Sequence, residues 1–234
     1  MPDTLAPRAI IGVMTPAMNS VVQPELELLR PVGVTNQMQR FRLGGSHISD
    51  DLAEEAEKLT DVKPAALAIC LTTDAGPDGV AKLAAYSDML TARLGIPVFN
   101  ASVALQNALQ AVGACRVAVL TPFNAEVNRV VRINIENGGF EAVAVRGTEA
   151  ASLEAICETP LARIRDLVHE LAAFNCDAIA QVGTALPLVG LIEELERETG
   201  KTIIACNAAV YWQTLRAAGI RDAVPGYGHL LNEV

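Results

Sequence analysis

The sequence feature that most constrains the fold is an internal repeat. Three segments of the first half recur in the second half, in the same order and at offsets of 106, 112 and about 107 residues. This nearly constant spacing predicts that one unit of roughly 100 residues was duplicated. The matching pairs are GVMTPAMNSVV (12–22) with AVLTPFNAEVN (118–128), ALAICLTT (66–73) with AIAQVGTA (178–185), and NASVALQNALQAVG (100–113) with NAAVYWQTLRAAG (207–219).

Each half of the repeat alternates two patterns. Strands that alternate with helices form βαβ units with right-handed crossovers, so we predict an α/β fold of two pseudo-symmetric lobes, each a parallel sheet flanked by helices. Short apolar runs typical of buried parallel strands lie at 9–14, 65–71, 117–120, 178–182 and 202–206. Amphipathic stretches of helical period lie at 50–59, 161–174 and 188–199.

The repeat also suggests where the lobes divide. We expect an N-terminal lobe over residues 1–113 and a C-terminal lobe over 114–212. The tail, 213–234, then completes the last helix and packs back on the first lobe. Glycines at 95 and 200 follow two helical stretches and mark their ends.

Charge and cysteine content exclude several classes of partner. The net charge is −9 and the sequence pI is about 4.9, without a basic run, so we expect no nucleic-acid or anionic-membrane partner. No apolar run reaches the roughly 20 residues that span a bilayer. The N-terminus lacks the pattern of a signal peptide. Five cysteines without CxxC spacing suggest reduced thiols in the cytoplasm. With three histidines and four lysines, the chain has few groups for acid–base chemistry.

Small polar residues gather where the predicted strands end. Ligands of parallel α/β sheets bind beyond the carboxyl ends of strands. Hydroxyls, amides and helix N-termini there can hold carboxylates, although each residue taken singly is as well explained as a helix N-cap. We expect the pair Thr72 and Thr73 to be functional. The other members of this set are Asn19, Asn124 and Thr184.

Motifs for nucleotides, metals and serine nucleophiles are missing. The chain has no GxGxxG after a strand, no GxxxxGK[ST], no HExxH and no GxSxG. We therefore expect no metal site. The loop at 44–47, which contains His47, either touches the cleft or is solvated, and we favour the solvated loop. We expect His229, in the turn PGYGH, to be structural.

Three of these segments together resemble the Asp/Glu racemase superfamily, in the branch of maleate cis-trans isomerase and arylmalonate decarboxylase. They are TPxxN followed by VVQPE, the strand that ends in Thr72-Thr73, and NAAVYW followed by PGYGHLL. The resemblance implies an active site between the lobes, a small carboxylate substrate, and no metal or organic cofactor. Members usually place a cysteine at one strand end of each lobe. Its decarboxylases keep only the second cysteine and hold an enediolate with hydroxyls, backbone amides and a Tyr.

Only some of the family's site residues have a match in this sequence. Asn19 matches a substrate-binding Asn, and Thr72-Thr73 match the Thr-Ser pair after the first cysteine position. That register puts Leu71 at the first cysteine position. The internal repeat pairs Leu71 with Gly183, which falls at the second. Phe123 stands where the branch often has its Tyr. Both expected thiols and the phenol are then missing.

If the alignment is shifted by one residue, a cysteine falls at the first cysteine position. The shifted alignment reads Cys70-Leu71-Thr72 as Cys-x-Thr and makes Cys70 catalytic beside Thr72. Since a shift of one residue reverses the face of a strand, only one register can hold. Cys206 is a weaker candidate. We expect the remaining cysteines, Cys115, Cys157 and Cys176, to be structural.

Three functions stay open. The first is a cofactor-independent lyase or isomerase that acts next to a carboxylate of a small acid, through an enediolate held by Thr, Asn and backbone amides. Decarboxylation needs one protonation, so it tolerates missing thiols better than racemisation. The second is a hydrolase with water or Thr72 as nucleophile, and the third is a carboxylate-binding relative without activity. An Ala-rich helical surface suits a homo-oligomer. Leu71, Phe123 and Met18 hint at a less polar substrate.

Overall fold

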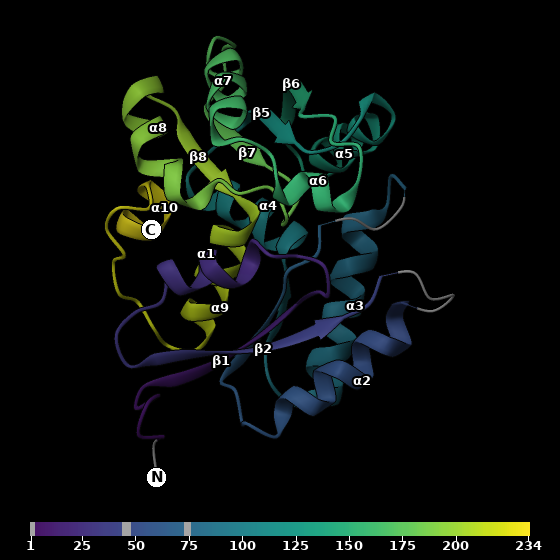
Figure 1. Ribbon diagram of the computed structural model, residues 1–234, viewed down its shortest axis with the longest axis vertical. Helices are drawn as coiled ribbons and strands as arrows, with labels where there is room; N and C mark the ends of the chain where they lie inside the picture. The colour runs from purple at the N-terminus through teal and green to yellow at the C-terminus, as the bar shows by residue number, and fades with distance from the viewer. Residues whose placement is uncertain (1–2, 44–47, 73–75) are drawn as a thin grey trace.

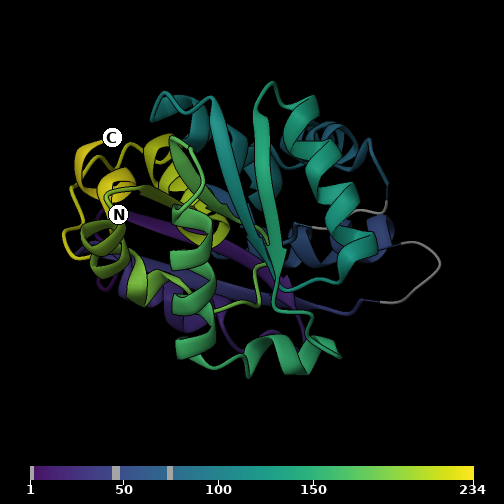
Figure 2. The same ribbon diagram turned by 90° about the horizontal axis from the view of Figure 1, so that it is seen from above.

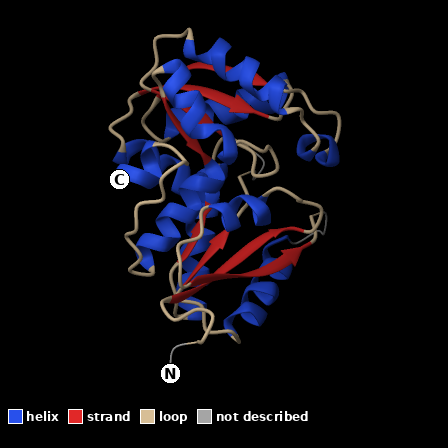
Figure 3. Ribbon diagram, turned by 60° about the vertical axis from the view of Figure 1, so that its left-hand side comes forward, coloured by secondary structure: helices blue, strands red, loops and turns tan. Residues whose placement is uncertain are grey.

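The computed structural model describes residues 3–43, 48–72 and 76–234, without the side chains of 48–51. Two parallel sheets form the frame of the molecule, as Figure 3 shows in red. Their strand orders are β2-β1-β3-β4 and β6-β5-β7-β8, so the second sheet repeats the topology of the first. The strands are β1 (Ala9–Pro16), β2 (Val34–Phe41), β3 (Ala66–Ile69), β4 (Val98–Asn100), β5 (Arg116–Thr121), β6 (Glu141–Gly147), β7 (Ala178–Gln181) and β8 (Thr202–Ala205). The predicted α/β fold of two similar lobes is confirmed.

Helices cover both faces of each sheet and lie between the two sheets (Figure 1). In the first half they are α1 (Val22–Leu28), α2 (Ile48–Thr60), α3 (Gly79–Leu94) and α4 (Ala101–Ala111). In the second half they are α5 (Ala125–Asn137), α6 (Leu153–Cys157), α7 (Leu161–Ala172), α8 (Ile192–Thr199), α9 (Cys206–Ala217) and α10 (His229–Glu233).

One predicted helix begins later than its pattern suggested. The stretch 188–199 opens with a 3₁₀ turn at Val189–Leu191, and the α-helix begins at Ile192. The two predicted helix ends are confirmed, because Gly95 and Gly200 have φ values of 70° and 65°. A left-handed backbone of this kind suits glycine, which lacks the Cβ that would clash.

The lobes exchange one helix each across their interface. α9 of the second half packs on β3 and β4 of the first sheet, and α4 of the first half packs on β7 and β8 of the second. The two helices also pack against each other, so one apolar core runs through both lobes. In Figure 1, α9 accordingly lies in the lower lobe among the purple and blue elements.

The C-terminal tail returns to both halves of the molecule. Asp222 pairs with Arg8, just before β1, at 2.5 Å, and α10 packs on α9 and β8. The division into lobes at 113 and 212 stays a prediction, because each exchanged helix packs on the sheet of the other lobe.

Candidate active site

A pocket lies between the lobes, where strands of both sheets end. It contains about 50 Å³ of free space in this structure, little more than one or two water molecules occupy. A substrate must therefore displace some of its lining. The described lining residues are Pro16, Met18, Asn19, Leu43, Leu71, Thr72, Pro122, Phe123, Leu153, Ile156, Gly183, Thr184 and Ala185.

Hydrogen bonds between the lobes hold one polar corner of the pocket. Asn19 is 1% exposed, and its Nδ2 donates to Thr184 Oγ1 at 3.2 Å. Thr184 Oγ1 in turn donates to the carbonyl of Cys70 at 3.2 Å. Asn19 Oδ1 accepts from the amides of Val21 and Val22, which fixes this side chain at the start of α1. The corner is therefore ordered before any ligand binds.

Free donors complete this polar side. The amide N–H groups of Thr184 and Ala185 have no acceptor within the part of the chain that the structure describes. Thr72 is half-buried beside them, and its carbonyl accepts from Ser102 Oγ at 3.0 Å. This bond fixes the backbone of Thr72 and leaves its hydroxyl for a ligand. Amides and a hydroxyl without competing acceptors are suited to a carboxylate or an enediolate.

Arg40 of β2 organises the turn that carries Met18 and Asn19. Its Nη1 donates to the carbonyls of Ala17 at 3.2 Å and Asn19 at 2.9 Å. Its Nη2 donates to Gln23 Oε1 at 3.3 Å. Sequence reasoning missed Arg40, because neither a motif nor the repeat connects it with the strand ends.

Most of the other lining residues are apolar. Leu71, Phe123 and Met18 are among them, and these three were named from the sequence as the apolar lining. The sequence did not identify three further apolar lining residues, which are Leu43, just after β2, and Leu153 and Ile156 of α6. No sequence signal marks these last three, since each reaches the pocket through tertiary packing alone.

The structure decides how the end of β3 faces. Leu71 lines the pocket, whereas Cys70 is fully buried and belongs to the core under α9. Burial raises the pKa of the Cys70 thiol, and the nearby Cys206 and Glu25 raise it further. Without a place in the pocket wall and with a disfavoured thiolate, Cys70 does not fit the catalytic role expected of it.

Gly183 occupies the matching place in the second lobe. Its φ is 109°, and a Cβ added there would lie 2.6 Å from Pro122 Cδ. An L-residue would therefore be strained at this position. Cys206 does not supply the missing thiol, because it is fully buried and its Sγ donates to Gln181 Oε1 at 3.6 Å. Burial raises the pKa of this thiol as well.

The remaining residues named from the sequence lie apart from the pocket wall or outside the described residues. The Asn124 side chain caps α5 by accepting from Val127 N at 3.1 Å, as its N-cap interpretation predicts. His229 begins α10, where its Nδ1 lies 3.2 Å from Glu233. Thr73 and the loop at 44–47 with His47 lie outside the described residues.

A buried carboxylate behind the pocket was also missed. Glu25 Oε1 accepts from the amides of Leu188 and Val189 at 2.8 and 2.9 Å. Its Oε2 accepts from Asn207 Nδ2 at 2.7 Å, and the same Nδ2 donates to the carbonyl of Thr184 at 2.9 Å. Burial raises the pKa of Glu25 to about 7, against the lowering effect of these bonds. The VVQPE segment contains Glu25 but does not indicate its partners.

The described residues contain neither a cluster of metal ligands nor a membrane-spanning helix. Three or more His, Cys, Asp or Glu side chains nowhere converge as metal ligands in 3–43, 48–72 and 76–234. No helix of the described chain combines the length and apolarity that crossing a bilayer requires.

Comparisons with known proteins find similar sequences and similar folds. A family model described as "Arylmalonate decarboxylase" matches residues 33–231. The arylmalonate decarboxylase of Bordetella bronchiseptica is 26% identical over 193 residues, which are 81% of this chain and 80% of that protein. The maleate isomerase of Nocardia farcinica is 25% identical over 239 residues, 95% of each chain. The crystal structure of the maleate isomerase Iso from Pseudomonas putida S16 superimposes with a TM-score of 0.83 at 23% identity, over 96% of this chain and 98% of that one.

Proposed function

Because the chain belongs to the arylmalonate decarboxylase family, we propose that it is a cofactor-independent enzyme that decarboxylates a small malonic acid bearing an apolar substituent. The observation that carries this proposal is the mixed lining of the pocket. It combines the Thr72 hydroxyl and the free amides of Thr184 and Ala185 with apolar side chains such as Leu71 and Phe123. A substrate with one retained carboxylate and one apolar group matches such a lining.

The reaction divides into two steps. The substrate carboxylate that stays binds to Thr72 and to the two free amides. The bond from the α-carbon to the other carboxylate breaks, CO₂ leaves, and the electron pair passes into an enediolate on the retained carboxylate. Fixed donors aimed at that developing charge stabilise it without reorganising, which is worth roughly 3 kcal/mol for each donor. Protonation of the α-carbon then completes the reaction.

We propose that water delivers this proton. None of the lining residues within the described chain carries a titratable side chain, and Cys70 and Cys206 are buried away from the lining. The side chains of four titratable residues, His47, Asp50, Asp51 and Asp74, are not described by the structure, so their substitution tests a side-chain donor. A loss of about 10²-fold or more in turnover in His47→Gln, or in the Asn variant of any of the three aspartates, with KM unchanged, would contradict the water donor.

The missing thiols are why we prefer decarboxylation to racemisation. Racemisation by two cysteines requires an acid and a base on opposite faces of the α-carbon. Leu71 and Gly183 occupy the two matching positions and provide neither. Several relatives are named maleate isomerase, so the isomerisation of maleate is the second reaction to assay.

The experiment follows CO₂ release from 2-methyl-2-phenylmalonate and fumarate formation from maleate. We expect CO₂ release and, in D₂O, a single deuterium at the α-carbon of the product. Thr72→Val removes the hydroxyl and keeps the shape, so it should lower turnover by about 10²-fold. Thr60→Val, at the end of α2, is the matched control and should keep full activity. Exchange of the α-hydrogen in both enantiomers of the product would reject this preference.

Two other outcomes distinguish the remaining hypotheses. Hydrolysis of small esters or cyclic amides that is lost in Thr72→Val would favour the hydrolase. Stabilisation of the protein by dicarboxylates, without turnover of any of these compounds, would favour a carboxylate-binding protein.

We also propose that the protein acts as a homo-oligomer in the cytoplasm. Large apolar side chains are exposed on the surface, with Val32 at 90% and Leu28 at 51%. All five cysteines are free thiols, which suits a reducing compartment. Light scattering after gel filtration tests the assembly, and a monomer would contradict it.

A further inference from the structure

A second hollow lies on the C-terminal lobe, over β6, the edge strand of its sheet. Viewed from above in Figure 2, α5 and α7 flank this strand on its two sides. The hollow has a volume of about 430 Å³, far larger than the pocket between the lobes. Its charged lining consists of Arg129, Arg132, Arg146, Arg163, Glu149 and Glu170, which we call the arginine groove.

Two of these arginines are oriented by the protein itself. Arg146 Nε donates to Glu170 Oε1 at 2.5 Å, and its guanidinium stacks 5.4 Å above the Phe174 ring. Arg132 donates to the carbonyl of Ala142, which lies on the edge strand. Because their positions are set before binding, less side-chain freedom is lost when a ligand arrives.

The guanidinium groups of the other two arginines have no partner. Arg129 of α5 and Arg163 of α7 are exposed, and neither side chain makes a hydrogen bond or ion pair with any residue in the described ranges. They rise from opposite sides of the hollow. Their guanidinium groups are therefore free to close on a ligand from both sides.

The charge of the groove is unusual for this chain. The whole protein has a net charge of −9, yet four arginines and two glutamates line this hollow, and Glu136 beside it lies 3.5 Å from Arg132. Converging guanidinium groups repel each other, and an anion between them removes that repulsion. The planar guanidinium fork also matches the oxygens of phosphates and carboxylates.

We propose that the arginine groove binds a compact multivalent anion, a phosphate ester or a polycarboxylate. Arg129 and Arg163 contact its oxygens from the two sides, and Arg132 and Arg146, which are paired with Glu136 and Glu170, form the floor. An isolated row of solvated arginines would not need a hollow of this size or two members held in place.

The groove is connected with the pocket between the lobes. Asn128 lines the groove, its Nδ2 donates to the carbonyl of Phe123 at 3.1 Å, and its Oδ1 accepts from Thr121 Oγ1 at 2.5 Å. Gly147 also lines the groove and lies so close to that carbonyl that a Cβ would overlap it. Phe123 forms part of the pocket wall, so the bound anion lies directly behind this wall.

Calorimetric titration with sodium pyrophosphate and with citrate, at low ionic strength, tests the proposal. The wild type should bind at least one of the two at a single saturable site. Arg129→Gln/Arg163→Gln should bind about tenfold more weakly or worse, since two charge-assisted contacts are lost. The control, Arg197→Gln/Arg221→Gln, removes the same charge from exposed positions outside the groove and should keep the wild-type affinity.

The two ligands and one further variant separate the alternatives. Pyrophosphate alone would identify a phosphate site, and citrate alone a polycarboxylate site. Binding that persists in Thr72→Val places the anion outside the pocket, whatever reaction that pocket performs. Absence of saturable binding, or equal weakening in the two double variants, would overturn the proposal. Circular dichroism of each variant checks that it is folded.

Discussion

Gly183 shows how one residue separates this chain from the pattern that it resembles. Its φ is 109°, and a Cβ at this position would lie only 2.6 Å from Pro122 Cδ, which leaves no place for a side chain. A cysteine here would require the 121–123 segment or the Gly183 backbone to move. The backbone conformation of this strand end therefore leaves no room for a cysteine side chain.

We predict that Gly183→Ala lowers the free energy of unfolding by about 2 kcal/mol or more, from backbone strain and overlap with Pro122. Urea unfolding measures this change. Gly190→Ala is the matched control, because Gly190 is exposed and a Cβ there meets nothing within 4 Å. It should change stability by no more than about 0.5 kcal/mol. Equal effects in both variants would contradict the strain at Gly183.

Glu25 makes stability depend on pH. Its ordinary pKa of 4.5 rises to about 7 in the folded protein because the carboxyl is buried. The folded state then holds the proton more tightly than the unfolded state. The stabilisation from this group is complete below about pH 4.5 and is lost as pH rises to about 7. The size of the loss is about 3 kcal/mol.

The prediction is that Glu25→Gln flattens the fall in unfolding free energy between about pH 4.5 and 7. Urea unfolding at a series of pH values measures the difference between the variant and the wild type. Glu126→Gln, which removes an exposed carboxylate from α5, is the control. An unchanged slope in Glu25→Gln would show that the buried carboxyl is not the source.

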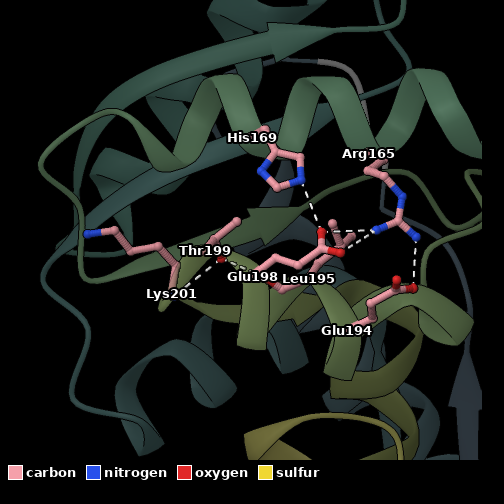
Figure 4. Close-up of polar contacts among 7 residues, drawn as sticks. All are labelled: Arg165, His169, Glu194, Leu195, Glu198, Thr199 and Lys201. Carbon is pink, nitrogen blue, oxygen red and sulfur yellow. Dashed lines mark hydrogen bonds and ion pairs between the residues drawn. The ribbon is translucent and has the colours of Figure 1, made fainter.

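At the scale of elements, Figure 4 shows the polar contacts between α7 and α8. Arg165 of α7 donates to Glu194 at 2.8 Å and to Glu198 at 3.0 Å, and His169 Nε2 lies 3.0 Å from Glu198. Arg165 also holds the pKa of Glu194 below its ordinary value. Such exposed ion pairs stabilise little singly, because water and salt screen them.

We therefore predict a small, salt-dependent effect of Glu198→Gln. Its Tm should fall by a few degrees at low salt and should equal that of the wild type at ~1 M NaCl, where charges are screened beyond about 3 Å. Glu158→Gln, outside this network, is the control. A large loss that salt does not reduce would mean that α8 is held mainly through Glu198, and not through buried residues such as Leu195.

Element boundaries show where periodicity stops being informative. The apolar pattern of 188–199 continues through Val189–Leu191, yet the chain forms a 3₁₀ turn there. The amides of Leu188 and Val189 donate to Glu25 from the other lobe, which fixes the backbone where the 3₁₀ turn begins. The periodicity of a segment cannot report a partner that lies more than a hundred residues away.

At the scale of the whole molecule, the exchanged helices α4 and α9 make each sheet depend on the other half of the chain. α9 covers β3 and β4, and the apolar core passes through it. A fragment of residues 1–113 lacks this cover, so the buried faces of Ala68 and Cys70 would meet water.

We predict that fragments 1–113 and 114–234 do not unfold cooperatively when separate and regain a cooperative transition when refolded together. Near-ultraviolet circular dichroism and urea unfolding measure both, with the full chain as reference. Independent cooperative folding of both fragments would contradict this and would support two autonomous domains.

The sequence by itself determined the duplicated α/β frame, the strand ends and the small polar residues that follow them. These features depend on local periodicity and on a repeat, which any reader of the chain can align. Asn19, Leu71, Thr72, Phe123, Gly183 and Thr184 were named from the strand ends, the repeat and the family resemblance, and all line one pocket.

Only the tertiary structure decided which of Cys70 and Leu71 faces the pocket, and that Leu43, Leu153 and Ile156 reach it. It also decided that Glu25 is bound by the other lobe. The physical reason is that β3 ends at Ile69, so the regular alternation of a strand does not decide which of the following residues faces the cleft. Which side is the cleft depends on how distant segments pack, and local patterns do not contain that information.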